Sequence, residues 1–360
     1  MKRVRIISTI LALTLILGVT AAGCTKASTS KKTRQLVIAN WKGYGSDTPY
    51  AINTFEKANN CKIVHQYYDS EDGLLNMLKQ GGIGKIDVML PNLGYMQRVI
   101  KQNLAEPIDL SKLKNYNDII EDLRNQKDLR DSNGKVYGIP WVWGTTSIGY
   151  NPDKIKEKPT SIAVLWDPKY KGQIAFNDDY TCAVLSAALY LKEKDPYNPN
   201  LDKVKEVLIK AKQNSKLLWS SYDDFSKAYT SGSVILGNVW SGAATELKAE
   251  GQKIEYIYPE EGTVAWLDTW CIAKNAPNKD LAYKWIDFMT STEFQKKFTS
   301  NPKDQPPIPA NKKVFDSMTD EQKKALWVYP SVPTNLVMEK SLPDETTEKW
   351  QKLWDEVKAS

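Results

Sequence analysis

The stretch Gln35-Leu-Val-Ile-Ala-Asn-Trp-Lys-Gly-Tyr-Gly-Ser46 joins an apolar run to a loop rich in glycine and aromatic residues. Residues 35–39 predict a buried strand, and Asp47 or Thr48 followed by Pro49 predicts the start of a helix. Further apolar runs at 61–65 and 86–90 predict strands, with a helical pattern at 73–79 between them. This alternation favours an α/β fold with a mostly parallel sheet.

A second block of the same kind begins near Trp141. We expect its strands at 147–150, 173–176 and 234–237, and its helices at 182–194 and 202–213. An extended segment at 265–273, a helix at 280–289 and an amphipathic helix at 350–357 follow. No internal repeat and no long linker divides the body, so the pattern predicts two lobes with a short hinge.

The composition limits the classes of function. The chain has 360 residues, of which 41% are hydrophobic and 26% charged, and its mean hydropathy is −0.48, so we expect two packed domains rather than a polytopic membrane protein. The only histidine is His65, which excludes a histidine-rich zinc site. The net charge is +6, and without Lys2, Arg3 and Arg5 it is too small to favour nucleic acid as a partner.

The N-terminus has the pattern of an export signal. Three basic residues precede a largely apolar run at 6–19, and small residues lead to Cys24. The Gly-Cys junction resembles the bacterial lipobox, with Ala21 where leucine is usual. We therefore expect a signal peptide at 1–23, lipidation of Cys24, and a lipid-anchored tether at 24–34 on the extracytoplasmic face of the cell membrane.

Three cysteines remain in the body of the chain, Cys61, Cys182 and Cys271. Their spacing predicts no metal cluster, and small buried hydrophobic side chains are the expected role. The sequence leaves open whether Cys182 and Cys271 bond to each other.

Aromatic and acidic residues follow the ends of several expected strands. Because open α/β sheets bind ligands outside the carboxyl ends of their strands, these residues should line one edge of each lobe. Trp faces next to carboxylates suit a cationic amine, since a buried ammonium needs a carboxylate as well as a ring. The residues at these positions are Trp41, Tyr44, Asn92, Tyr95, Asp178, Asp179 and Trp240. Period-2 alternation adds Trp266, Asp268 and Trp270 on one side of the extended segment at 265–273.

As a set, several motifs resemble the spermidine/putrescine-binding proteins of ABC importers, over essentially residues 35–360. The motifs are Asn40-Trp41 with Tyr44, Tyr68-Asp-Ser-Glu71, Trp143-Gly-Thr-Thr146, Tyr150-Asn-Pro152, Trp166-Asp167, Pro168-Lys-Tyr-Lys-Gly172, Asn177-Asp-Asp179, Val239-Trp-Ser-Gly242 and Trp266-Leu-Asp268.

The resemblance implies a type II periplasmic-binding-protein fold, with two α/β lobes joined by a two-stranded hinge near residues 141 and 267. Residues 35–141 and 268–312 would form lobe 1, and residues 142–267 and 313–360 lobe 2. It implies a ligand site without catalytic residues, metal or cofactor, and a monomer that works with ABC permease subunits. The implied ligand-binding residues are Trp41, Tyr44, Asn92, Asp179, Trp240, Trp266 and Asp268.

The chain departs from the family pattern at several positions. Asn92 and Gly94 stand where relatives often have a serine and an aromatic residue, and Cys182 stands where they have a glutamate. Gly43 replaces a residue that can be acidic, and a tyrosine is missing near Gln305. With fewer acids, a diamine or a monocation is favoured over a triamine.

Two alternatives to an amine receptor stay open. The same fold could bind another small amine or a different solute, and Lys42 beside the first loop keeps an anionic solute in consideration. A secreted hydrolase could use carboxylates such as Asp178, Asp179 and Glu260 or Glu261 as acid and base. No Gly-x-Ser-x-Gly elbow and no metal motif supports the hydrolase.

Overall fold

The computed structural model describes residues 33–303 and 306–360. The predicted signal peptide, Cys24 and most of the predicted tether lie outside the described residues. Within the described part, no helix is both long and apolar enough to cross a membrane.

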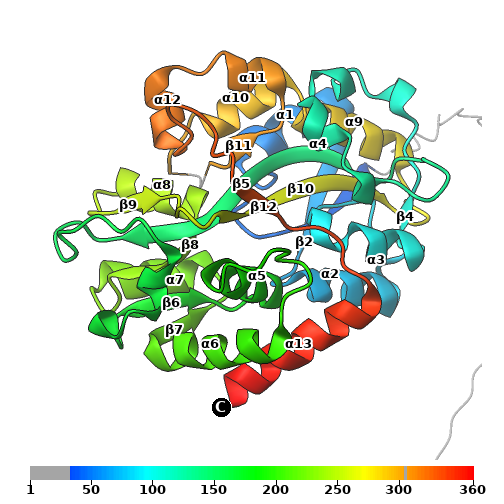
Figure 1. The fold of residues 1–360 in the computed structure, drawn as a ribbon. Coiled ribbons are helices and arrows are strands. Elements are labelled where there is room, and N and C mark those ends of the chain that lie inside the picture. Colours follow the sequence, from blue (N-terminus) through cyan, green and yellow to red (C-terminus); the bar gives the residue numbers. More distant parts are fainter. Residues whose placement is uncertain (1–32, 304–305) are drawn as a thin grey trace, which may run out of the picture. The chain divides into compact units, whose positions relative to one another are not determined.

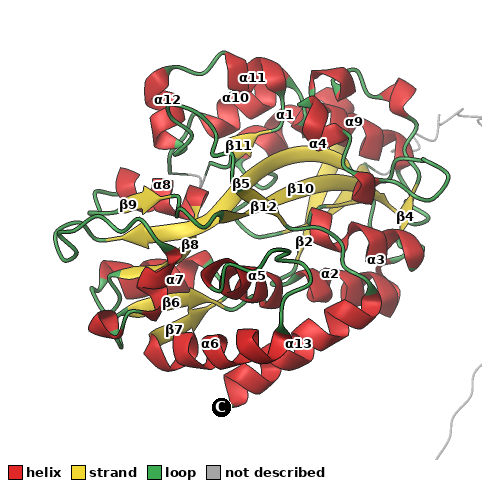
Figure 2. Cartoon of the chain, viewed as in Figure 1, coloured by secondary structure: helices red, strands yellow, loops and turns green. Residues whose placement is uncertain are grey.

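The described residues alternate strands and helices, as predicted (Figures 1 and 2). The strands are β1 (Arg34–Asn40), β2 (Cys61–Tyr67), β3 (Val88–Met89), β4 (Ala105–Glu106), β5 (Ile139–Tyr150), β6 (Ile174–Asn177), β7 (Ser215–Trp219), β8 (Leu236–Trp240), β9 (Glu255–Ile257), β10 (Thr263–Ala273), β11 (Ile308–Pro309) and β12 (Leu336–Met338). The helices are α1 (Pro49–Asn59), α2 (Glu71–Met77), α3 (Met96–Lys101), α4 (Glu121–Arg124), α5 (Tyr180–Tyr190), α6 (Leu201–Asn214), α7 (Tyr222–Thr230), α8 (Ser241–Ala249), α9 (Lys279–Met289), α10 (Thr292–Thr299), α11 (Lys312–Asp316), α12 (Asp320–Ala325) and α13 (Asp344–Ala359).

Two parallel groups of strands are joined through a pair of long antiparallel strands. The order is β2-β1-β3-β10-β5-β8-β6-β7, with β4 and β12 also on β10 and β9 and β11 also on β5. Strands β1, β2 and β3 run parallel, as do β6, β7 and β8. The long strands β5 and β10 cross between the groups side by side (Figure 1). The fold class is therefore confirmed, with the strand pair at the predicted crossover residues.

The apolar side chains gather around each parallel group. One core contains residues from β1 to the start of β5, then from the end of β10 to residue 328. The second group is covered on both faces, because Ile174 and Phe176 of β6 face α5, α6 and α13, whereas Ala175 faces α7 and α8. Helix α13 thus packs on the second group although it is the last element of the chain.

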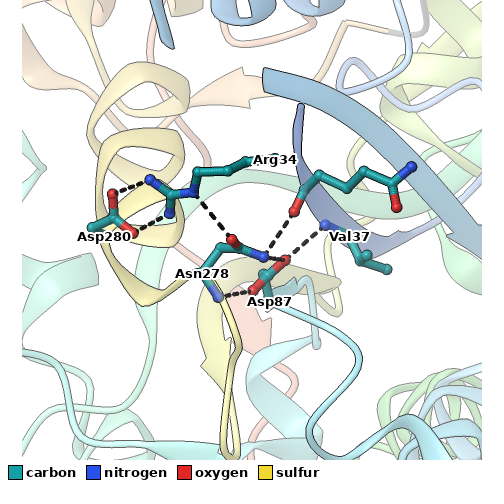
Figure 3. A network of polar contacts seen from close by, with 6 residues as sticks. Arg34, Val37, Asp87, Asn278 and Asp280 are labelled. Atoms are coloured by element: carbon teal, nitrogen blue, oxygen red, sulfur yellow. Dashed lines mark hydrogen bonds and ion pairs between the residues drawn. The ribbon is translucent and has the colours of Figure 1, made fainter. Parts of the chain in front are cut away.

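A buried aspartate ties the first group together (Figure 3). Asp87 is fully buried, and its carboxylate accepts hydrogen bonds from the backbone N–H of Val37 at 2.9 Å and of Asn278 at 2.6 Å. The neighbouring guanidinium of Arg34 pairs with the carboxylate of Asp280. These contacts join β1, the start of β3 and the segment before α9. Strand β3 is shorter than predicted, and Asp87 just before it is joined to β1 both by its side chain and by its backbone N–H, which donates to the Val37 carbonyl at 2.9 Å.

Candidate functional site

Asp268 lies on β10 at an irregularity in its pairing with β5. The register shifts between Asp268 and Thr269, which is typical of a β-bulge, and bulges re-aim side chains near functional sites. The Asp268 side chain accepts hydrogen bonds from the Tyr44 hydroxyl at 2.8 Å and from Asn92 Nδ2 at 3.3 Å. Three of the predicted site residues therefore meet at one carboxylate.

The charge of Asp268 has no cationic partner in the described part of the chain. Asp268 is only 7% exposed. Burial raises the pKa of this carboxyl to about 6, and the hydrogen bonds from Tyr44 and Asn92 act in the opposite direction. A buried carboxylate held by neutral donors alone is poised to accept a cation.

The loop after β1 holds Tyr44 in place. The Asn40 amide donates to the Tyr44 carbonyl at 3.0 Å and to the Ser46 hydroxyl at 2.7 Å. Gly45 has a positive φ of 72°, and a Cβ there would lie 3.0 Å from the Phe298 ring. A glycine is therefore needed to turn this loop against the first core.

Trp41 begins the same loop. Its ring packs edge-on against Tyr68, with 4.8 Å between centroids, and it is partly exposed. The Tyr68 hydroxyl donates to the Leu90 carbonyl at 2.6 Å, which places this aromatic pair over the end of β3.

Asp179 comes from the second group of strands. It caps helix α5, where its Oδ1 accepts the backbone N–H of Cys182 at 2.8 Å. Burial raises the pKa of the Asp179 carboxyl, and the backbone hydrogen bonds lower it. The residue keeps some accessible surface.

The next residue connects the two groups of strands. The Tyr180 side chain packs against both the first and the second core, and it interacts with Tyr95 from the loop after β3. Tyr95 was noted in the sequence as a residue following a strand, and Tyr180 was not.

Two further acids were not predicted as site residues. Burial raises the pKa of both Glu71 and Glu339 well above the usual range, and the nearby Asp268 and Asp179 carboxylates raise it further. Glu71 begins α2 after the Ser70 cap. It belongs to a motif that the resemblance quoted, so a signal existed. Glu339 follows β12, a short strand that the sequence pattern did not reveal.

The tryptophans differ in their surroundings. Trp266 pairs with Gly144 across β5 and β10, and a Cβ on Gly144 would lie 2.4 Å from Trp266 Cζ2. The indole therefore lies over the bare backbone of β5, and its buried Nε1 has no hydrogen-bond partner. Trp240 ends β8 and meets Trp219 edge-on at 4.8 Å. No contact in the described residues joins Trp240 directly to Asp268.

Trp270 was expected on the same side of β10 as Trp266, but it is a core residue. Its exposure is 0%, and its ring packs against Trp141 at 5.3 Å and Trp285 of α9 at 5.9 Å. Strand β10 enters the first core at Trp270. Helix α9 therefore covers β10 at Trp270, whereas β10 is partly open at Trp266.

Two of the acids considered for a hydrolase, Asp178 and Glu261, are engaged elsewhere. Asp178 accepts the indole N–H of Trp354 at 2.7 Å and lies 3.3 Å from the Lys358 ammonium. Glu261 accepts the backbone N–H of Ile162 at 3.0 Å. These contacts fasten α13 and the loop before residue 166, which is a structural role.

The three cysteines of the body are free and buried, so Cys182 and Cys271 do not bond to each other. Cys182 lies 3.7 Å from Asn238 Nδ2, whereas Cys271 lies 3.5 Å from Met96 Sδ in the first core. Lys42 is exposed.

Comparisons with known proteins identify the family of this chain. Residues 50–330 match the model of the family described as bacterial extracellular solute-binding protein. The chain is 32% identical over 287 residues to the spermidine/putrescine-binding periplasmic protein of Escherichia coli (strain K12), covering 78% of each. It is 28% identical to the putrescine-binding periplasmic protein SpuD of Pseudomonas aeruginosa (strain UCBPP-PA14), covering 98% of each.

A solved structure shows the same fold. The spermidine/putrescine ABC transporter substrate-binding protein PotD of Streptococcus pneumoniae superposes with a TM-score of 0.74 and 25% identity. The match covers 91% of this chain and 99% of that one.

Proposed function

The chain belongs to the bacterial extracellular solute-binding proteins, and we propose that it captures a putrescine- or spermidine-like amine and delivers it to an ABC importer. The observation that carries this proposal is the Asp268 carboxylate, which is buried among neutral donors without a cation. The relatives named above bind spermidine or putrescine, according to their descriptions.

The energetics favour an amine guest. A desolvated ammonium over a tryptophan ring gains about 0.5–2 kcal/mol, which does not offset a desolvation cost of several kcal/mol. A carboxylate about 4 Å away supplies on the order of 4 kcal/mol at an intermediate dielectric. Asp268 therefore supplies the main attraction, and Trp266 adds a smaller contribution.

The proposed binding mode uses both groups of strands. Lobe 1 would contribute the loop after β1 and Asn92, and lobe 2 would contribute Asp179. A guest that contacts both lobes stabilises the closed arrangement, because it gains contacts that the open one lacks. The proposed ligand-binding residues are Trp41, Tyr44, Asn92, Asp179, Trp240, Trp266 and Asp268.

The proposal includes the place where the protein works. Its relatives are periplasmic binding proteins. We expect export, lipidation of Cys24 and a tether that keeps a monomeric receptor near its permease. We also expect that the protein binds the amine without catalysing a reaction on it, because its family consists of binding proteins.

A ligand panel tests the function. Purified protein lacking residues 1–24 is heated with putrescine, spermidine, choline or an amino acid, and ligands that raise the melting temperature are measured by calorimetry. We expect putrescine or spermidine to give the largest shift. A response only to a sugar or a carboxylate would refute the amine assignment and leave the family membership intact.

A further inference from the structure

The segment that follows β12 is fixed on both sides of the site. Strand β12 pairs in parallel with residues 263–265 of β10, and the Glu339 N–H donates to the Ala265 carbonyl at 2.7 Å. Two residues later, the Ser341 hydroxyl donates to the Leu93 carbonyl at 3.1 Å and accepts the Gln97 N–H at 3.1 Å. In Figure 1, β12 lies along β10. The backbone at Glu339 is thus held between β10 and the loop after β3.

The Glu339 side chain lies beside a glycine of that loop. A Cβ on Gly94 would be 3.9 Å from the Glu339 Cβ, which is an ordinary van der Waals contact and places this acid next to the loop after β3. The carboxylates that act on Glu339 are Asp179, Asp268 and Glu71. Lys340 does not neutralise it, because its ammonium lies 3.5 Å from the Tyr197 ring centroid. No ion pair of Glu339 occurs among the residues the structure describes.

Glu71 presents an unpartnered oxygen to the same group of acids. Its Oε1 accepts the Asn92 backbone N–H at 3.2 Å, whereas its Oε2 is buried without a hydrogen-bond partner. Asn92 also donates to Asp268, so these two acids share one neighbour. A buried carboxylate oxygen without a donor is costly, and an ammonium is a donor that can satisfy it.

We propose that Glu339 and Glu71 are ligand-binding carboxylates which, with Asp179 and Asp268, select a guest carrying at least two positive charges. The inference rests on the proposed amine-binding function. The sequence predicted few acids in this site. The proposal reverses that expectation, because Glu71 and Glu339 lie on segments that the sequence pattern did not place there.

Charge balance gives the selectivity. Burial, together with repulsion from the neighbouring carboxylates, raises the pKa of Glu71 and Glu339, which favours their protonated forms when the site is empty. A monocation neutralises one charge and leaves the others in repulsion. A diamine neutralises two, and its binding releases protons from the acids that it pairs with.

The test compares Glu339→Gln with Glu206→Gln, which removes the same charge from an exposed position of α6. The probes are putrescine and 1-aminobutane, an amine of the same length with one charge. Calorimetry in two buffers of different ionisation enthalpy gives both the affinity and the number of protons released.

For Glu339→Gln we expect putrescine affinity to fall on the order of tenfold or more, with a smaller loss for 1-aminobutane. Proton release should decrease, and the ligand-free protein should melt at a higher temperature because a neutral amide replaces an acid whose charged form is disfavoured by burial and by its acidic neighbours. Glu206→Gln should match the wild type in all of these measurements.

Glu71→Gln serves as the second variant, since glutamine still accepts the Asn92 N–H. Unchanged preference for putrescine over 1-aminobutane and unchanged proton release in both variants would overturn the inference. A wild-type protein that binds no amine would instead refute the proposed function, so the two failures are distinguishable.

Discussion

Two buried aspartates of this protein, Asp87 and Asp268, have opposite surroundings. Asp87 is fully buried and accepts backbone N–H groups from two separate segments (Figure 3). Asp268 is almost as buried, yet its donors are the side chains of Tyr44 and Asn92. Burial alone therefore does not distinguish a structural acid from a ligand-binding one.

The donors make the difference. Backbone N–H groups that meet Asp87 would be unsatisfied without it, so the carboxylate and the fold depend on each other. The donors of Asp268 are instead the Tyr44 hydroxyl and the Asn92 side-chain amide, and no cation pairs with this carboxylate among the described residues. The fold tolerates Asp268 as a costly group, and we propose that an ammonium compensates that charge.

The largest expected effect is that of Asp268→Asn on binding. The amide keeps the size of the side chain but loses the charge, so a buried ammonium has no counter-ion. We expect amine affinity to fall by about 3 kcal/mol, or more than a hundredfold, measured by calorimetry. Amine affinity equal to that of the wild type would contradict the proposed role.

Stability should depend on pH through the same residue. The folded pKa of Asp268 is about 6, above its ordinary value, so the folded protein holds this proton after the unfolded chain has lost it. The contribution of Asp268 to stability therefore falls as pH rises from about 4 to 6. We expect the stability difference between Asp268→Asn and wild type to grow over this range.

Urea unfolding of the ligand-free proteins at several pH values measures that difference. Amine affinity of the wild type should change in the opposite direction and rise with pH, because the ionised acid is the one that binds. A stability difference that is constant from pH 4 to 7 would show that Asp268 titrates normally.

Asp87→Asn should affect stability and leave binding intact. The amide offers one acceptor oxygen where the carboxylate offered two, so N–H groups of Val37 or Asn278 lose a partner. We expect the free energy of unfolding to fall by about 1–3 kcal/mol in urea titrations. Amine affinity of the folded fraction should be unchanged, and a selective loss of affinity would remove the contrast with Asp268.

The smallest expected effect is that of Trp266→Ala. Its ring is partly exposed and lies over Gly144, so its loss should weaken amine binding by about 0.5–2 kcal/mol with little change in melting temperature. Trp270→Ala, in the same strand, is the matched control. It should destabilise the fold by roughly 3–5 kcal/mol, because Trp270 is fully buried. Equal destabilisation by both would place Trp266 in the core.

The sequence pattern predicted the main α/β elements because their periodicities are strong and local. Strand β1, the start of α1 at Pro49 and the long strand β10 all occur at the predicted residues. The same pattern did not reveal β12, which has three residues and is a strand only because β10 lies beside it. Tertiary pairing of this kind leaves no local signal.

The sequence predicted those residues of the candidate site that lie on strands or directly after them. Tyr44, Asn92 and Asp268 follow or lie on predicted strands, and they make direct contact. Glu71 lies at the start of a helix and Glu339 after an unpredicted strand, so periodicity assigned neither to the site. Trp270 shows the converse, because alternation identifies a face of a strand but not what covers it.

The position of α13 has a consequence for how the chain acquires its structure. Trp350, Leu353, Trp354 and Val357 share a core with side chains of β6 and α5, which precede them by more than 150 residues. That core therefore stays incomplete until the residues of α13 are available. A chain truncated before residue 344 would leave apolar surface of α5 and α6 bare, and proteases should recognise such fragments readily.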